Sequence, residues 1–372
     1  MPTLRRDIVD SQNPGVYHCI SRCVRRESLL SSPERRRWIV QRIEKLIEFL
    51  AIDVISFAVM ENHLHLLLRI RPDIVRSWSD REVATRRIAV LPNKRSRSRN
   101  GIAADAEPTE QELSAILSNP RLLERARRDL SDLGFFHRLL KEPSARMWNE
   151  EDGVTGHFWE GRFRSPRVLD DASLLRVSRY IELNEIRARA ADSVPSSIWT
   201  SARNQWMKLV RSLGHLVDDR SKGPEALDNI VWEPVFPCCS KEPMAVRDGS
   251  PHECEPRKPL IEYLLELDLL GRSRHPAKPG FISRTTRDLL EDSEAALIRA
   301  GHAAASAREY LRDAFLVRLR SLTLTIARAL PQESPERRSE HHYGSCYGDA
   351  DSVSREANRR SAVRLIPILI LE

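Results

Sequence analysis

Two histidines stand two residues apart at the start of an apolar run, His63-Leu64-His65-Leu66-Leu67-Leu68. The segment 63–70 is predicted to be a strand, so both imidazoles project from one face and the alternating leucines supply core on the other. Two imidazoles side by side at the end of a hairpin can share one divalent cation. The alternative is a pair of ordinary strand histidines that are hydrogen-bonded or exposed.

Tyr180 and Asn184 form a second pair with chemical potential. They are four residues apart in a predicted helix that starts at Asp170 or Asp171 and runs to about Ala191, so they share one face. A phenol can act as a nucleophile, and an Asn carbonyl oxygen is a hard, neutral ligand that suits Mg²⁺ or Mn²⁺ together with two imidazoles. The structural alternative is a packed tyrosine beside an asparagine that is mildly unfavourable within a helix.

The elements that must position these pairs follow from periodicity. Segment 16–23 is predicted to be a strand of mixed facing, and segment 52–60 is a strand rich in β-branched and aromatic residues. Glu61-Asn62 makes a turn into strand 63–70. Ser32-Pro33 opens a helix that runs to Ala51. The order strand, helix, strand, strand predicts an α+β fold with a ferredoxin/RRM-like antiparallel sheet and packed helices.

The rest of the chain divides by composition. We expect a first domain over 1–217, with a basic helical insertion at about 75–142. Prolines and glycines are frequent over 218–259, which predicts a linker. Residues 260–372 are expected to form a mainly helical C-terminal extension.

Bulk properties narrow the class of protein. The chain has 372 residues and a formal net charge of +7, with a pI of about 9.2 and a mean hydropathy of −0.44. No apolar run approaches the roughly 20 residues needed to cross a bilayer, and the first residues lack the apolar core of a secretory signal. We therefore expect a cytoplasmic protein with reduced cysteines and a polyanionic partner, and no membrane.

Taken together and in this order, the two pairs resemble a known family. The run Met60-Glu61-Asn62-His63-Leu64-His65-Leu66 is similar to the metal-binding HUH strand of single-tyrosine transposases, and Arg179-Tyr180-Ile181-Glu182-Leu183-Asn184 is similar to their catalytic helix. Segments 136–141, 148–149 and 158–163 resemble the stretch that precedes that helix in REP-associated tyrosine transposases. The likeness covers about residues 13–205.

The resemblance implies a DNA transposase that cleaves and rejoins hairpin-bearing single-stranded DNA through a 5′-phosphotyrosine. Tyr180 would be the nucleophile, and His63, His65 and Asn184 would hold Mg²⁺ or Mn²⁺. The covalent link conserves the energy of the phosphodiester, so no nucleotide cofactor is expected. A nucleoid-associated location follows from the DNA partner. A homodimer stays open, because some relatives exchange the catalytic helix between protomers and others act as monomers.

Basic and aromatic residues near these motifs are candidates for DNA contact. Seven positive charges lie between Arg81 and Arg99 against the single acid Glu82, and such a run is either a solvated face or a phosphate-binding surface. Trp159 would stack on unpaired bases or, alternatively, pack a hairpin against the sheet. The expected phosphate-binding residues are Arg86, Arg87, Arg95, Arg97, Arg162, Arg164 and Arg167.

Two departures from the family pattern keep other functions open. Glu185 stands where the family usually has proline after the Asn, and Glu61 stands where proline commonly precedes Asn-His. A catalytically decayed or domesticated hairpin-binding protein is the first alternative. A replication initiator or relaxase-type HUH nuclease is the second, but it commonly has a third histidine or a second tyrosine. A His-based phosphohydrolase would want a further histidine at the place of Leu67.

Overall fold

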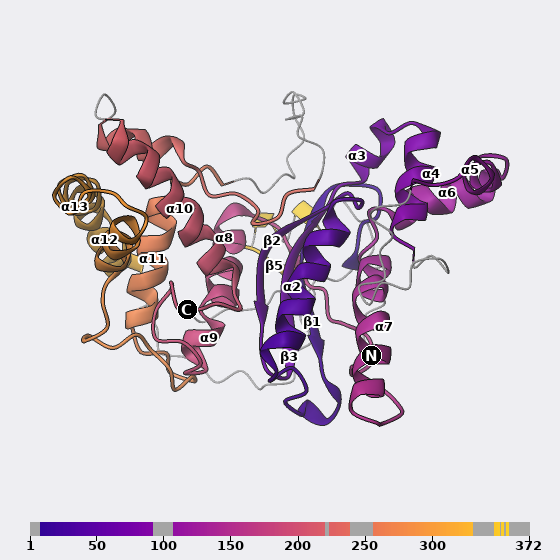
Figure 1. The fold of residues 1–372 in the computed structure, drawn as a ribbon, viewed down its shortest axis with the longest axis horizontal. Coiled ribbons are helices and arrows are strands. Elements are labelled where there is room, and N and C mark those ends of the chain that lie inside the picture. Colours follow the sequence, from indigo (N-terminus) through magenta and orange to yellow (C-terminus); the bar gives the residue numbers. More distant parts are fainter. Residues whose placement is uncertain are drawn as a thin grey trace. The chain divides into compact units, whose positions relative to one another are not determined.

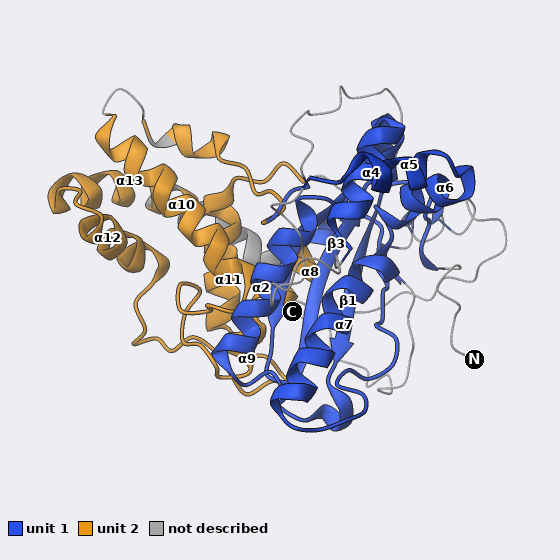
Figure 2. Ribbon diagram, turned by 45° about the vertical axis from the view of Figure 1, so that its right-hand side comes forward, with its two compact units in different colours: residues 1–174, 236–254, 344–369 blue, residues 175–235, 255–343, 370–372 orange. Residues whose placement is uncertain are grey.

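The computed structural model describes residues 8–91, 107–219, 223–238, 256–329, 346–349, 351–352 and 355–356. Contacts divide the chain into two compact units, coloured separately in Figure 2. Unit 1 contains residues 1–174, 236–254 and 344–369, and unit 2 contains residues 175–235, 255–343 and 370–372. Each unit therefore draws on residues from both the predicted first domain and the predicted extension. The domain boundaries expected from composition stay a prediction.

Unit 1 is built on a mixed five-stranded sheet with the strand order β2-β3-β1-β4-β5 (Figure 1). Its strands are β1 (Gly15–Arg22), β2 (Ile52–Val59), β3 (His63–Ile70), β4 (Arg167–Val168) and β5 (Cys346–Tyr347). The pairs β1·β3, β2·β3 and β1·β4 are antiparallel, and β4·β5 is parallel. The predicted strands over 16–23, 52–60 and 63–70 are confirmed to within one residue at each end, and the expected α+β class is confirmed with them.

Helix α2 (Pro33–Ile47) shows why the sequence starts a helix at this point. The Ser32 hydroxyl accepts hydrogen bonds from the backbone N–H groups of Glu34 and Arg35, and a proline occupies the first helical position. The helix buries Ile39, Ile43 and Leu46 at helical spacing. The other helical elements of unit 1 are η1 (Val24–Arg26), α3 (Pro72–Ser77), α4 (Asp80–Ala89), α5 (Glu110–Leu117), α6 (Pro120–Asp129) and α7 (Leu133–Glu151).

Unit 2 is helical. Its elements are most of α8 (Asp171–Glu182), which begins in unit 1, then α9 (Asn184–Arg187), α10 (Ser201–Asp218), η2 (Pro224–Asn229), α11 (Leu260–Arg272), α12 (Leu289–Arg299) and α13 (Ala304–Ala329). The structure thus bears out the helices expected beyond residue 260. The stretch 218–259, expected to be a linker, contains η2, and Phe236 forms a bridge with Val54 of β2.

The helix predicted over 170–191 is shorter than expected. It is interrupted at Leu183, and its second part ends at Arg187. The Asn184 side chain donates to the carbonyls of Tyr180 (2.9 Å) and Ile181 (3.2 Å), so it competes with main-chain donors for helical acceptors. Arg189 then adopts a left-handed conformation (φ 60°), which ends the helix.

Further expectations concern the cysteines and the membrane. Cys19, Cys23, Cys238 and Cys346 are buried, and none of these four cysteines is in a disulfide bond. No helix among the described residues is both long and apolar enough to span a bilayer.

Candidate functional site

His63 and His65 lie at the start of β3, which is flanked by β2 and β1 in the interior of the sheet. Their ring centroids are 4.9 Å apart and the rings meet edge to face. The alternating leucines Leu64, Leu66 and Leu68 are fully buried, as the strand pattern predicts. The structure therefore brings the two imidazoles together on one face of the strand.

Asn62 fixes the proton on His63. The Asn62 amide nitrogen donates to the Arg26 carbonyl at 3.0 Å, so its oxygen is the acceptor that lies 2.6 Å from Nδ1 of His63. Nδ1 of His63 must then carry the proton, and Nε2 carries the lone pair. A metal held by His63 in this orientation would bind through Nε2, with the other ring nitrogen hydrogen-bonded as metal-ligating histidines require.

His65 is held by two residues that the sequence analysis did not single out. Nε2 of His18, on β1, lies 2.9 Å from Nδ1 of His65, and Nδ1 of His18 lies 2.9 Å from the Tyr347 hydroxyl on β5. His18 is 1% exposed, and its burial lowers its pKa to about 3, so this imidazole is neutral. The YHC sequence marks His18 as a strand residue, but nothing in the sequence pairs it with position 65 or with position 347.

Tyr180 and Asn184 lie together in unit 2 with a lysine beside them. Lys278 donates from Nζ to Oδ1 of Asn184 at 3.2 Å, and the same ammonium lies 4.4 Å from the centroid of the Tyr180 ring. Burial, followed by the nearby Arg187 charge, lowers the pKa of Lys278 to about 8. The Asn184 oxygen expected to bind a metal thus accepts a hydrogen bond from a cationic side chain.

The polar residues around Tyr180 in the RYIELNEIR segment anchor its helix. Glu182 accepts hydrogen bonds from Ser201 and Tyr263, both at 2.5 Å, and burial raises the pKa of Glu182 to about 7. Arg179 forms an ion pair with Glu266 at 2.7 Å. These contacts hold α8 against α10 and α11.

The residues beyond Asn184 also have structural partners. Glu185 accepts a hydrogen bond from the Trp199 backbone N–H at 2.9 Å, so the residue found in place of the family's proline organises the following loop. Arg187 donates to the carbonyls of Leu270 (2.8 Å), Ser273 (2.6 Å) and Gly280 (3.3 Å).

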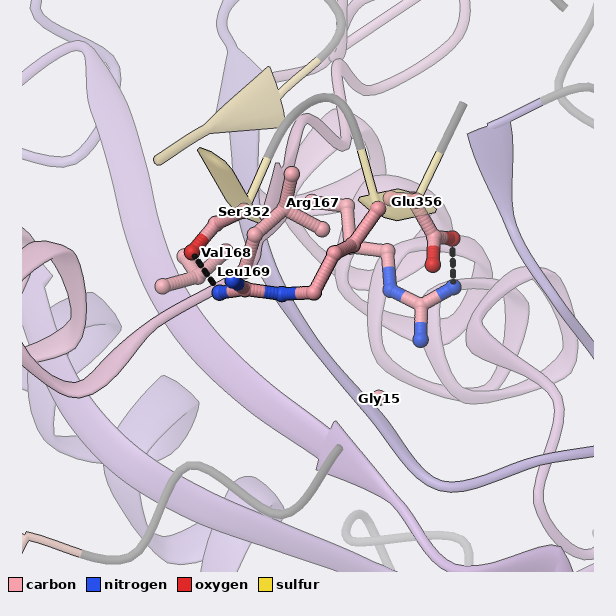
Figure 3. A pocket seen from close by; sticks show the side chains of 7 residues that line it. Gly15, Arg167, Val168, Leu169, Ser352 and Glu356 are labelled. Carbon is pink, nitrogen blue, oxygen red and sulfur yellow. Dashed lines mark hydrogen bonds and ion pairs between the residues drawn. The ribbon is translucent and has the colours of Figure 1, made fainter. Parts of the chain in front are cut away.

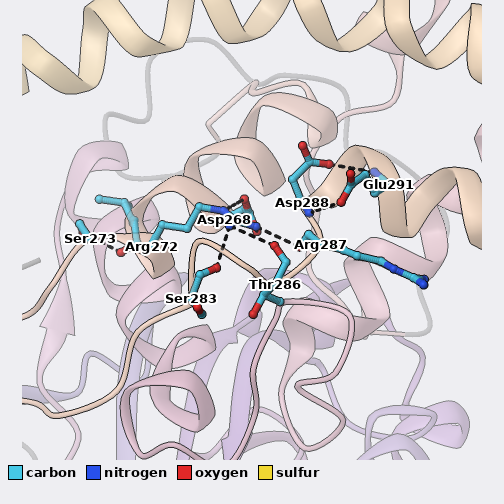
Figure 4. A network of polar contacts seen from close by, with 9 residues as sticks. Asp268, Arg272, Ser273, Ser283, Thr286, Arg287, Asp288 and Glu291 are labelled. Atoms are coloured by element: carbon cyan, nitrogen blue, oxygen red, sulfur yellow. Dashed lines mark hydrogen bonds and ion pairs between the residues drawn. The ribbon is translucent and has the colours of Figure 1, made fainter.

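The loop that carries Lys278 is held at both of its ends. A Cβ at Gly280 would stand 1.9 Å from the Ile186 carbonyl oxygen, so only glycine permits this approach to α9. Figure 4 shows the far end, where the Asp268–Arg272 pair meets the loop before α12. Arg272 donates to the carbonyls of Ser283 and Arg287, and Asp288 and Glu291 form a capping box at the start of α12.

Several of the expected DNA-contacting residues have intramolecular partners instead. Arg86 pairs with Glu82 at 3.0 Å and lies over the Trp78 ring, and Arg87 pairs with Asp129 at 2.8 Å. Trp159 is 7% exposed and packs on Phe158 and Trp148. Its indole therefore offers little surface for stacking on a base.

The expected DNA-binding arginines after residue 160 differ in their exposure to solvent. Arg162 and Arg164 are exposed. Arg167 is buried and pairs with Glu356 at 2.6 Å beside a cavity of about 30 Å³, which has room only for water (Figure 3). Arg95 and Arg97 lie outside the described residues.

The predicted site residues divide between the two units: His63 and His65 belong to unit 1, whereas Tyr180 and Asn184 belong to unit 2. Within the described residues, no cluster of three or more His, Cys, Asp or Glu side chains is arranged to hold a metal. The expected ligands are two imidazoles and one amide oxygen, so only two of the three are side chains of these four types. The amide oxygen is a donor of the kind that Mg²⁺ and Mn²⁺ take, and with both Nδ1 atoms in hydrogen bonds, each imidazole would ligate a metal through Nε2.

Comparison with known proteins gives little beyond this geometry. No family model and no curated protein matches the chain. Among solved structures, the chain is similar to a REP-associated tyrosine transposase bound to a REP hairpin, with 12% identity, a TM-score of 0.32, and coverage of 68% of this chain and 98% of that chain. At this TM-score the likeness establishes neither the fold nor the function of the chain.

Proposed function

We propose that the protein is a metal-dependent tyrosine transposase that cuts and rejoins hairpin-bearing single-stranded DNA. The observation that carries this proposal is the pair His63 and His65, whose rings lie 4.9 Å apart at the start of β3, with the Nδ1 atom of each held by a hydrogen bond. Orientation of this kind prepares both Nε2 atoms for one cation. Asn184 is the proposed third ligand.

The strand order supports the proposed ferredoxin/RRM-like core. In unit 1, β1 pairs with β3 and β4, and β2 pairs only with β3 among the described strands. This order is the one that a β-α-β-β-α-β unit produces when its strands form one antiparallel layer. The parallel β5 is an addition to it.

Tyr180 is the proposed nucleophile, and its phenol would form a 5′-phosphotyrosine and leave a free 3′-hydroxyl. A cation bound by His63, His65 and Asn184 would neutralise charge that develops on the scissile phosphate. An ordinary tyrosine has a pKa of about 10, so Tyr180 needs a nearby positive charge to attack efficiently. The anchoring of α8 by Glu182 and Arg179 would keep the phenol in place during attack.

Exchange of Tyr180 for phenylalanine tests the nucleophile. With Mn²⁺ and a labelled hairpin oligonucleotide, we expect Tyr180→Phe to form no covalent adduct while it binds the oligonucleotide with unchanged affinity. Tyr310→Phe is the matched control, because Tyr310 donates to the Gly223 carbonyl in the same unit and has no place in the motif. Adducts in the Tyr180→Phe protein would show that another residue attacks.

A hairpin-binding protein without cleavage activity is the second candidate. The observation in its favour is the Lys278–Asn184 hydrogen bond, which places a cationic group at the oxygen that the metal would need. Such a protein would bind the hairpin with or without Mn²⁺ and would yield no cleaved strand. The transposase instead requires Mn²⁺ or Mg²⁺ for cleavage, and a chelator should abolish it.

A further inference from the structure

Three buried side chains from separate strands form a continuous hydrogen-bonded chain that ends at a proposed metal ligand. The Tyr347 hydroxyl on β5 meets Nδ1 of His18 on β1, and Nε2 of His18 meets Nδ1 of His65 on β3, each at 2.9 Å. His18 is 1% exposed and His65 is 4% exposed. We refer to Tyr347, His18 and His65 as the relay.

The relay has two internally consistent proton arrangements, because a neutral imidazole has one N–H and one lone pair. In the first, Tyr347 donates to His18, His18 donates to His65, and His65 carries its own proton on Nε2. In the second, His65 donates from Nδ1 to His18, and His18 donates from Nδ1 to the Tyr347 oxygen. Only the second arrangement leaves a lone pair on Nε2 of His65.

We infer that His18 and Tyr347 are positioning residues that select the metal-binding tautomer of His65. The inference rests on the proposed metal site and extends it. Nδ1 of His65 is occupied by His18, so a metal must bind at Nε2, and the proton on Nδ1 then needs an acceptor. His18 is that acceptor only when its own Nδ1 proton has one, which is the Tyr347 oxygen.

The relay gives a role to a segment that follows the helical extension in the sequence. Tyr347 lies on β5, which pairs in parallel with β4 in the sheet of unit 1, 329 residues after His18. The metal site of the proposed enzyme would therefore be complete only when residues 346–347 have joined the sheet.

The test is Mn²⁺ binding by the full-length chain, measured by calorimetric titration. Loss of such outer-shell partners typically weakens metal binding by about 10- to 100-fold, and we expect a loss in this range for Tyr347→Phe and for His18→Leu. His18→Gln, which places an amide oxygen near the former Nε2, should recover part of it. Tyr17→Phe is the matched control: Tyr17 neighbours His18 on β1 and is fully buried, but its hydroxyl accepts from the Asp10 backbone N–H.

The outcomes separate this inference from the proposed function. If His65→Ala abolishes Mn²⁺ binding while Tyr347→Phe and His18→Leu bind as tightly as the unaltered chain, the metal site stands and the relay is refuted. If the unaltered chain binds no Mn²⁺, both fail.

The tautomer can also be read without any substitution. In the ¹⁵N-histidine-labelled chain saturated with diamagnetic Zn²⁺, nitrogen chemical shifts should place the proton of His65 on Nδ1 and that of His18 on Nδ1. A proton on Nε2 of either residue would overturn the inference.

Discussion

Asn184 has two competing partners in the proposed mechanism. Its amide nitrogen is bound to the Tyr180 and Ile181 carbonyls, which fixes the side chain, and its oxygen accepts from Lys278. A metal at this oxygen would have to displace an ammonium group. The free energy of the Lys278–Asn184 hydrogen bond is therefore subtracted from the free energy of metal binding at this oxygen.

Removal of Lys278 should therefore strengthen metal binding. A hydrogen bond from a charged donor contributes about 1.5–3 kcal/mol net, so we expect Lys278→Met to raise Mn²⁺ affinity by about 10-fold or more in a calorimetric titration. Lys258→Met serves as the control, because Lys258 pairs with Glu266 in the same unit. An unchanged or weaker affinity in the Lys278→Met protein would mean that the lysine and the metal do not compete for Oδ1 of Asn184.

At the scale of elements, the helix that carries Tyr180 is held mainly by residues distant in sequence, on α10 and α11. Arg187 is 4% exposed and binds three backbone carbonyls, one in the last turn of α11, one directly after α11 and one in the loop of Lys278. Since these acceptors would lose a charged donor, we expect Arg187→Ala to destabilise unit 2 by about 2–4 kcal/mol. Differential scanning calorimetry would measure this loss as a lower unfolding temperature of the Arg187→Ala protein.

Arg189→Ala is the matched control for this loss. Arg189 is exposed and donates one hydrogen bond to Pro279, so its removal should leave the unfolding temperature nearly unchanged. Equal shifts for the two variants would show that the carbonyl contacts of Arg187 do not hold the helix.

The elements also show what a sequence can and cannot predict. The strand at 52–59 was predictable from its β-branched and aromatic residues, and the strand at 63–70 from its apolar run. The two-residue spacing of His63 and His65 placed both imidazoles on one face. The relay was not, because it depends on the register Ile20↔His65 between β1 and β3 and on a two-residue strand near the end of the chain. The interruption of the helix at Leu183 could not be predicted, because it depends on which main-chain carbonyls accept hydrogen bonds from the Asn184 side chain.

At the scale of the whole molecule, the chain returns to its first sheet near its C-terminus. Besides the β4·β5 pairing, Arg167 and Glu356 form an ion pair with side chains 6% and 4% exposed. Removal of one partner from a buried pair costs about 3–5 kcal/mol, because the other charge stays buried. We therefore expect Glu356→Ala to destabilise unit 1 by about that amount, as measured by calorimetry.

The control for Glu356 is an exposed pair in the same unit. Glu142 and Arg146 form an ion pair one helical turn apart on α7, with both side chains more than half exposed. Exposed pairs contribute little, so Glu142→Ala should unfold at nearly the temperature of the unaltered chain. If Glu356→Ala behaves in the same way, the ion pair between Arg167 and Glu356 does not stabilise unit 1.

Anomalous diffraction at the manganese edge, from crystals of the Tyr180→Phe chain bound to Mn²⁺ and a hairpin oligonucleotide, tests most directly whether the two imidazoles and Asn184 share one metal. We expect one manganese peak ligated by Nε2 of His63, Nε2 of His65 and Oδ1 of Asn184, with the ring of residue 180 facing the scissile phosphate. Either the same chain or a second copy supplies the Asn184 side chain. A peak away from both imidazoles, or an Asn184 that no copy brings to the metal, would contradict it.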